Sequence, residues 1–347
     1  MAILTLRLPA VKPAPASQLA RCSLCGWKRI QRWGTCTKPV RDSKLQQVIV
    51  QRYRCCRCHR TWRHYPEGID RADQTLRLRH LAALLWTLGL SLRGVVALFD
   101  AFALTLSHMT VLRDVRALAG ELRHQRQARR VRVLGLDGAV TRIAGQEVGL
   151  VVAVDLGSGE PIAVAAIEER NVSAVLAWLG PLARQLEVEV LVTDDLHSYQ
   201  TVTEQLGLYH QRCLFHLRRW VGRTGRELRP PLPSEWEPIL DQVSELVRAL
   251  PEDGAIQLLQ LWQQLPREGR AHRKDHTAVD KLRRLVWRLH HNWADYRLGL
   301  TQPDVPLTNN GTEQAIGRFK VRSRSVRGFK AWSGVDATML LATRLAA

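Results

Sequence analysis

The sequence has 347 residues, which is enough for two or three domains that each bury a core. Its 51 Lys and Arg residues outnumber 32 Asp and Glu, and the formal net charge of +19 indicates a polyanionic partner. Apolar residues (46%) and charged residues (24%) are near globular averages, and no stretch reaches the roughly 18 uncharged apolar residues of a membrane span. The composition therefore excludes a disordered chain and an integral membrane protein.

The first residues and the cysteines indicate the compartment. Residues 1–8 carry one basic residue, Arg7, and lack the layout of a secretory signal, so we expect the protein in the cytoplasm. Six of the seven cysteines fall between Cys22 and Cys58. An odd number of cysteines crowded into one segment is unlike a secreted disulfide scaffold and favours metal binding by reduced thiols.

The cysteine cluster predicts a zinc ribbon over residues 18–66. It consists of two Cys-x-x-Cys pairs, and the second pair begins 30 residues after the first one ends: Cys22 and Cys25, then Cys55 and Cys58. Four thiolates complete a tetrahedral Zn²⁺ site and leave no position for substrate, so the site would be structural. Cys36 and Cys56 are then spectators or alternative ligands, and the opposing interpretation is a chance group of free cysteines.

Residues 72–122 have the periodicity of short helices. Leucines recur at helical spacing from Leu76 to Leu88, and Ser91 and Ser107 are suited to cap two further helices. The third helix is expected to turn Arg113 and Arg116 outward. Three short helices with a basic last helix are typical of a helix-turn-helix, so we predict a DNA-binding domain, although any small helical bundle produces a similar pattern.

From Val131 the pattern changes to that of strands. Apolar runs at 131–136, 149–154 and 161–167 are followed by a helix at 172–185 and a continuous apolar strand at 188–192. Three meandering strands, a helix and a fourth strand are the order of an RNase H-like sheet. In that order the first and fourth strands are neighbours.

Acidic residues follow these two neighbouring strands. Asp137 comes after the first, and Asp194 and Asp195 come after the fourth. We therefore expect Asp137 and Asp194 to meet at one end of the sheet. Close carboxylates repel each other unless a cation lies between them, and hard cations such as Mg²⁺ prefer oxygen ligands. The pair predicts the beginning of a divalent-cation site, for Mg²⁺ or Mn²⁺.

A third carboxylate is suggested by a late segment. Pro306 to Glu313 has the composition of a loop and helix cap, with Glu313 in the first helical turn. For an isolated glutamate, complementarity to the helix dipole is the alternative explanation. A basic run that we expect to contact DNA follows it, with Arg318, Lys320, Arg322 and Arg324.

Three motifs in this order resemble those of the DDE-type transposases of bacterial insertion sequences. They are Asp137, Thr193-Asp194-x-x-x-x-Tyr199 and Asn309-Asn310-x-x-Glu313. The segment from Arg52 to Trp62 is also similar to zinc ribbons that precede helix-turn-helix segments in such enzymes. The resemblance covers about residues 20–345. Gln314 departs from the family, in which an arginine often follows the last acid, and so does Gly138, where some groups carry a glutamate.

The resemblance implies roles for the matched positions. Asp137, Asp194 and Glu313 would bind two divalent ions for phosphodiester hydrolysis and strand transfer. Asp195 is a rival to Asp194, which we prefer because its spacing to Tyr199 matches the family. His216, in Cys213-x-x-His216, would lie near the active site and contact the scissile phosphate. The alternative for this pair is a buried cysteine and a histidine that faces along a helix.

The predicted fold is multidomain α+β. Its parts are the zinc ribbon, the helix-turn-helix, an RNase H-like mixed α/β sheet and an all-helical insertion that interrupts the catalytic domain, which occupies 130–216 and 304–345 around the insertion at 217–303. The function implied is an active transposase that binds the terminal inverted repeats of its element. The alternatives are a DNA-binding regulator without strand transfer and a structure-selective nuclease. The family also implies a homodimer or larger assembly on double-stranded DNA.

Overall fold

The computed structural model describes residues 8–15, 21–267 and 276–344, and it contains helices together with two sheets. The segment examined for a signal, at 1–8, and the first residues of the predicted ribbon, from 18, lie largely outside this description. The chain divides into two compact units, Met1–His124 with Phe319–Ala347, and Gln125–Arg318. Within the described residues no helix is long and apolar enough to cross a membrane.

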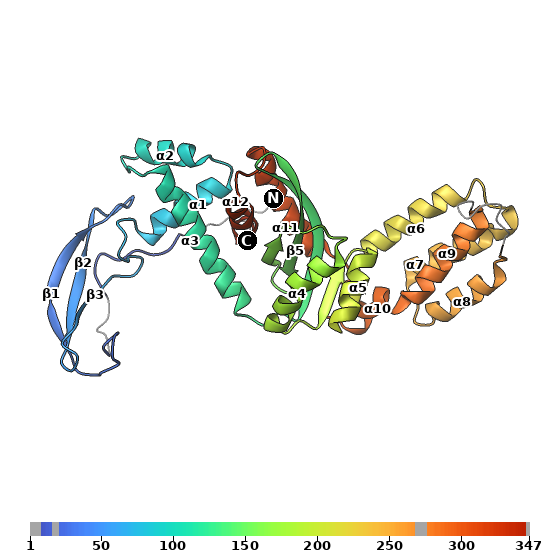
Figure 1. The fold of residues 1–347 in the computed structure, drawn as a ribbon, viewed down its shortest axis with the longest axis horizontal. Helices are drawn as coiled ribbons and strands as arrows, with labels where there is room; N and C mark the ends of the chain where they lie inside the picture. The colour runs from blue at the N-terminus through green and yellow to red at the C-terminus, as the bar shows by residue number, and fades with distance from the viewer. Residues whose placement is uncertain (1–7, 16–20, 268–275, 345–347) are drawn as a thin grey trace. The chain divides into compact units, whose positions relative to one another are not determined.

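The first unit begins with a three-stranded antiparallel sheet in the order β1-β2-β3. The strands are β1 (Ile30–Pro39), β2 (Gln47–Cys55) and β3 (Thr61–His64), drawn in blue in Figure 1. Alternate residues of β2 are buried, because successive side chains of a strand point to opposite faces. Val48 and Val50 thereby pack into a small core with Val40 and Ile69.

Three helices follow in the same unit: α1 (Leu76–Thr87), α2 (Leu92–Ala101) and α3 (His108–Gln127). The predicted caps are present, since Ser91 Oγ accepts from the amide of Gly94 and Ser107 Oγ accepts from the amide of Thr110. A further helix, α12 (Trp332–Arg344), adds Leu340 and Leu341 to their shared core. The chain end thus belongs to the unit that contains α1, α2 and α3.

The second unit is built on a five-stranded sheet in the order β6-β5-β4-β7-β8. The strands β4 (Val133–Ile143), β5 (Gln146–Asp155) and β6 (Glu160–Ala165) form an antiparallel meander, and β7 (Val190–Thr193) and β8 (Tyr209–Arg212) run parallel to β4. The prediction that the first and fourth strands of this sheet are neighbours is confirmed, since β4 pairs with β7.

Two strand predictions require correction. The first strand does not end at Asp137 and Gly138 but continues to Ile143, where Ala144 and Gly145 adopt positive φ and turn the chain into β5. The strand β8 was not predicted, because its four residues, Tyr-His-Gln-Arg, have no apolar run. His210, Gln211 and Arg212 are nevertheless buried there.

Helices complete the second unit. The sheet packs against α4 (Val172–Leu186) and α5 (His197–Leu206), and the shared core includes Leu136, Val151 and Leu179. The chain then forms the helices α6 (Leu214–Leu228), α7 (Glu237–Ala249), α8 (Gly254–Gln264), α9 (Ala278–His291) and α10 (Trp293–Thr301), shown in yellow and orange in Figure 1. Most of their leucines and valines bury one continuous core. The helix α11 (Asn310–Ser325) begins in this unit and continues into the first.

Candidate active site and metal centre

The four predicted zinc ligands lie together in the first unit. The Sγ atoms of Cys22 and Cys58 are 3.9 Å apart and those of Cys25 and Cys55 are 3.6 Å apart. All four sulfur atoms lie within 4.8 Å of one another. Zn–S bonds of about 2.3 Å in a tetrahedron place sulfur atoms about 3.8 Å apart, so this donor set fits one structural Zn²⁺.

Backbone amides support thiolates in this cluster. The amides of Arg57 and Cys58 donate to Cys55 Sγ, and the amide of Leu24 donates to Cys22 Sγ. Burial of Cys55 acts to raise its pKa, but the two amides and then the Cys25 and Cys58 thiols lower the pKa to about 6, while the pKa of Cys25 is raised to about 11. A lowered thiol pKa favours metal binding, because the thiolate is the ligand. Cys56 is exposed.

In the second unit, strand register brings Asp137 and Asp194 together. The parallel pairing of β4 with β7 matches Gly135 with Val192; Asp137 lies two residues further along β4, and Asp194 is the first residue after the end of β7. Burial raises the pKa of Asp137 to about 7, and the negative charges of Asp194, Glu169 and Glu313 add to the shift. Burial also raises the pKa of Asp194. The two carboxylates are therefore close enough to repel each other.

Glu313 reaches the same region through the loop before α11. Asn309 Nδ2 donates to the carbonyl of Leu136 at 2.7 Å, the amide of Asn309 donates to Cys213 Sγ at 3.3 Å, and Thr312 Oγ1 donates to Asn309 Oδ1 at 2.6 Å. These buried bonds attach the start of α11 to the residue before Asp137. Gly135 is required beneath them, because a Cβ there would lie 2.1 Å from Thr312 Oγ1.

Two of the three acids have buried oxygens without a hydrogen bond in the described residues, and this fits a divalent cation. Asp194 Oδ1 and Glu313 Oε1 are buried and have no hydrogen-bond partner in the described part of the chain. Buried carboxylate oxygens without partners are costly, and a hard cation is the partner that carboxylates bind best. In the described residues the oxygens of Asp137, Asp194 and Glu313 do not form a group within 4.8 Å, so binding a shared cation would draw them closer.

His216 lies between these acids and Cys213. Its Nε2 is 3.8 Å from Glu313 Oε1. The Cys213 side chain, and then the charges of Glu313 and Asp194, raise the pKa of His216 to about 9. The ligand atoms of Cys213, His216 and Glu313 also lie within 4.8 Å of one another. A cationic imidazole is therefore held next to the acids.

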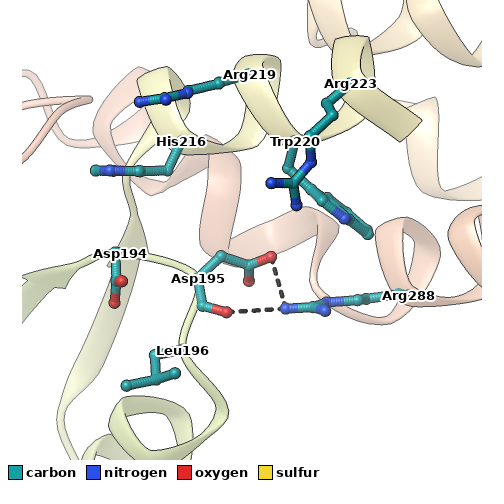
Figure 2. Close-up of a pocket in the computed structure, with 8 residues that line it drawn as sticks. All are labelled: Asp194, Asp195, Leu196, His216, Arg219, Trp220, Arg223 and Arg288. Atoms are coloured by element: carbon teal, nitrogen blue, oxygen red, sulfur yellow. Dashed lines mark hydrogen bonds and ion pairs between the residues drawn. The ribbon is translucent and has the colours of Figure 1, made fainter. Parts of the chain in front are cut away.

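Asp195 has a different environment from Asp194. Its carboxylate accepts from Arg212, which is 1% exposed, and from Arg288 Nη2 at 2.7 Å. Arg288 Nη2 also donates to the carbonyl of Asp195 at 2.8 Å. Figure 2 shows Asp195 directed toward Arg288 while Asp194 points elsewhere. Asp195 is thus engaged in ion pairs that join β8 and α9 to the end of β7.

A pocket of about 440 Å³ opens beside Asp194 (Figure 2). The helix α6 contributes His216, Arg219 and Arg223 to its lining, and Trp220, also on α6, lies 4.7 Å from the guanidinium of Arg288. In the described chain Arg219 has no ion-pair partner, so its charge is available to an anion. The lining residues are Asp194, Asp195, Leu196, His216, Arg219, Trp220, Arg223 and Arg288.

The residues predicted to contact DNA differ in exposure. Arg113 and Arg116 are exposed on α3, and Arg324 is exposed on α11. Arg318 and Lys320 are half-buried. Arg322 is 3% exposed, and its guanidinium lies 4.6 Å from the centre of the Trp86 ring. Burial lowers the pKa of Arg322 to about 10, so in this structure its charge faces the protein interior and not the solvent.

One acidic residue at the site had no sequence signal. Glu169, in the connection between β6 and α4, is half-buried, and burial followed by the charge of Asp194 raises its pKa. It stands 32 residues after Asp137 in a Glu-Glu-Arg stretch that resembles any solvated loop. Glu169 is recognised as part of the site only by its contact with β4, which forms only in the folded chain.

Carboxylates on neighbouring strands and on a late helix, with a cationic pocket beside them, define a protein with a candidate divalent-cation site for an anionic substrate. A family profile described as "Transposase IS66 family" matches residues 162–337, half of the chain, and the chain belongs to this family of transposases. Membership implies transposition, with DNA as the partner and divalent metal in use. The match includes Glu169, Asp194, His216 and Glu313 but begins after Asp137. No curated protein matches the chain.

Cysteine substitutions test the zinc cluster. We expect the wild-type protein to contain one equivalent of zinc and Cys55→Ser to lose it, because three ligands remain. The ribbon should then unfold locally, since zinc contributes roughly 10–16 kcal/mol in isolated zinc modules. Zinc content and hydrogen exchange over residues 30–64 measure both effects. Cys56→Ser is the matched control. If Cys56→Ser loses zinc and Cys55→Ser keeps it, Cys56 and not Cys55 is the ligand.

The buried charge of Asp137 predicts a pH-dependent stability. Its folded-state pKa of about 7 exceeds the ordinary value of 3.8, so the folded protein binds this proton more tightly than the unfolded chain does. The resulting stability is present at low pH and is lost as the pH rises toward 7. Without divalent cations, Asp137→Asn should therefore raise the free energy of unfolding at pH 8 by on the order of 2–4 kcal/mol.

Urea unfolding at pH 4 and pH 8 measures this difference, and the gain should be small at pH 4. Glu147→Gln, an exposed acid on the neighbouring strand β5, is the control and should show no such change. An Asp137→Asn variant that is less stable than wild type at pH 8 would show that no repulsion is stored there.

Proposed function

We propose that this protein is an active transposase that binds the terminal inverted repeats of its insertion sequence and catalyses metal-dependent DNA cleavage and strand transfer. Asp137, Asp194 and Glu313 are the cation-binding carboxylates in this proposal. The observation that supports it is the pairing of β4 with β7, from which Asp137 and Asp194 follow closely enough for the charges of Asp194 and Glu313 to act on Asp137. Asp194 Oδ1 and Glu313 Oε1 support it, because both are buried and accept no hydrogen bond from the described residues.

Each carboxylate has a distinct task. When bound, Mg²⁺ or Mn²⁺ activates the attacking oxygen and stabilises the leaving oxygen of a phosphodiester. Asp137, whose pKa is about 7 in the cation-free protein, has to be ionised to bind the cation, because only the carboxylate is a ligand. Asn309 keeps Glu313 in register with Asp137 through its bond to the Leu136 carbonyl. No side chain has to act as a covalent nucleophile.

The DNA phosphates have cationic partners next to the acids. His216, with a pKa of about 9, carries a proton at neutral pH and is positioned to contact the scissile phosphate. Arg219 and Arg223 line the neighbouring pocket and would hold the phosphates that flank it. Arg288 is occupied by Asp195, so its role is to fix the loop rather than to bind DNA.

We propose Asp194 as the second acid and assign a positioning role to Asp195. Both oxygens of the Asp195 carboxylate accept hydrogen bonds from arginines, whereas Asp194 Oδ1 has no partner in the described chain. A carboxylate already paired with two guanidinium groups is a poor ligand for a further cation. Asp194 is therefore the acid that remains available.

The remaining parts of the chain recognise DNA in this proposal. The zinc ribbon (18–66) and the helix-turn-helix (72–122) bind the transposon end, with Arg113 and Arg116 on the exposed side of α3. The RNase H-like sheet (130–216 and 304–345) is interrupted by the helical insertion (217–303). Basic residues of α11 that are accessible add phosphate contacts: Arg318, Lys320 and Arg324. Synapsis of two ends requires a homodimer or larger assembly, in the bacterial cytoplasm.

Cleavage and joining of an oligonucleotide that carries the element's own end tests the assignment. With Mg²⁺ or Mn²⁺ we expect Asp194→Asn and Glu313→Gln to abolish both reactions. Asp195→Asn should retain measurable joining but lose stability, because removing one partner of a buried ion pair costs roughly 3–5 kcal/mol.

The alternatives predict other outcomes in this assay. A wild-type protein that binds the end tightly but neither cuts nor joins it would contradict the proposal and favour a DNA-binding regulator. Cleavage that is independent of the end sequence would favour a structure-selective nuclease. Complete loss of activity in Asp195→Asn with full activity in Asp194→Asn would show that Asp195, and not Asp194, is the second cation-binding acid.

Salt dependence tests the pocket. If Arg219 contacts one phosphate, Arg219→Gln should reduce the slope of log affinity against log salt by about 1 and weaken binding equally for all end sequences. Arg248→Gln is the control, because Arg248 is exposed on α7, pairs with Glu245 and does not line the pocket. Equal slopes for wild type and Arg219→Gln would exclude this residue as a phosphate contact.

A further inference from the structure

Glu169 lies against the strand that carries Asp137. A Cβ atom at Gly138 would be 1.8 Å from Glu169 Oε2 and 2.6 Å from its carboxyl carbon. The Glu169 carboxylate therefore occupies the space above Gly138, directly next to Asp137 along β4. Glu169 enters from the connection between β6 and α4, whereas Asp194 enters from β7 on the other side of β4 in the sheet.

The glycine at 138 is explained by this contact alone. Gly138 pairs with Val151 in the antiparallel ladder and is not among the residues with positive φ, so its backbone conformation suits any amino acid. Its amide donates to Asp137 Oδ1 at 2.8 Å. A side chain at position 138 would therefore displace the Glu169 carboxylate from the space that it occupies.

A second group holds Glu169 in position. The hydroxyl of Tyr199, which is fully buried on α5, donates to Glu169 Oε2 at 3.5 Å. Tyr199 is also the residue at fixed spacing from Asp194 in the acidic motif. Four carboxylates therefore share this region, and the ion pairs of the described residues include no arginine or lysine with Asp137 or Glu169. Such a group of like charges requires a cation.

We propose that Glu169 is a fourth carboxylate of the catalytic centre and binds, together with Asp137, one of the divalent cations. This inference rests on the proposed function, because it adds a ligand to the same site. It assigns a residue of the β6–α4 connection to cation binding and gives Gly138 and Tyr199 the task of positioning its carboxylate.

Binding of Mn²⁺ to the zinc-loaded, full-length protein tests the inference without DNA. Titration calorimetry or electron paramagnetic resonance should show at least about a tenfold loss of affinity in Glu169→Gln, since even outer partners of metal ligands contribute that much. Glu168→Gln is the matched control. Glu168 is adjacent and also lies over a glycine, Gly149, but it is exposed, so its loss should leave Mn²⁺ affinity unchanged.

A double-mutant cycle tests the role of Gly138. Gly138→Ala should weaken Mn²⁺ binding about as much as Glu169→Ala does, because the new methyl group displaces the carboxylate. In the Glu169→Ala background the same Gly138→Ala change should have no further effect, since the space is then free. Additive losses would show that Gly138 acts independently of Glu169. Circular dichroism identifies a variant that fails to fold. In that case Glu169→Asp is measured instead, and its shorter side chain should reduce the affinity for Mn²⁺.

Asp194→Asn separates this inference from the function on which it rests. Wild-type Mn²⁺ affinity in Glu169→Gln, with strong loss in Asp194→Asn, would overturn the role of Glu169 and leave the proposed function standing. Wild-type affinity in both variants would overturn the cation site itself. Loss in both, with Glu168→Gln unchanged, is the result we expect.

Discussion

The second unit is organised around the repulsion between buried carboxylates. The pairing of β4 with β7 brings Asp137, on β4, near Asp194, which directly follows β7. Burial raises the pKa of Asp137 to about 7, and the negative charge of Asp194 adds to this shift. The fold therefore keeps charges together that would separate in a looser structure. A cation that binds there would draw the oxygens of the three acids closer together.

The polar scaffold around the acids opposes that repulsion. Asn309 joins the start of α11 to β4 and to the Cys213 thiol, and it does so in the interior, where unpaired groups would be costly. Asp195 and Arg212 form a buried ion pair at the end of β7, and Arg288 extends this pair to α9. The helical insertion is thus attached to the loop that carries Asp194.

Much of the site could be predicted because its signals are local. Apolar runs indicated four strands, their order placed Asp137 beside Asp194, and the Cys-x-x-Cys spacing identified the sulfur atoms that lie together. Three features could not be predicted. The strand β8 carries no periodicity, the Arg212–Asp195 pair joins residues on different elements, and Arg322 is buried in a run that looks uniformly basic. Each depends on tertiary contacts that no short window of sequence contains.

Glycines in β4 show how sequence records such contacts indirectly. Gly135 and Gly138 are unfavourable in a strand interior, because they pack no side chain and cost backbone entropy. Neither has the positive φ that would require glycine. Each instead lies beneath a polar group from a distant segment: Thr312 and Asn309 over Gly135, and Glu169 over Gly138. Glycines before and after the buried Leu136 therefore indicate a strand that side chains from distant segments contact closely. In this chain, those residues lie next to the candidate cation-binding carboxylates of β4 and α11.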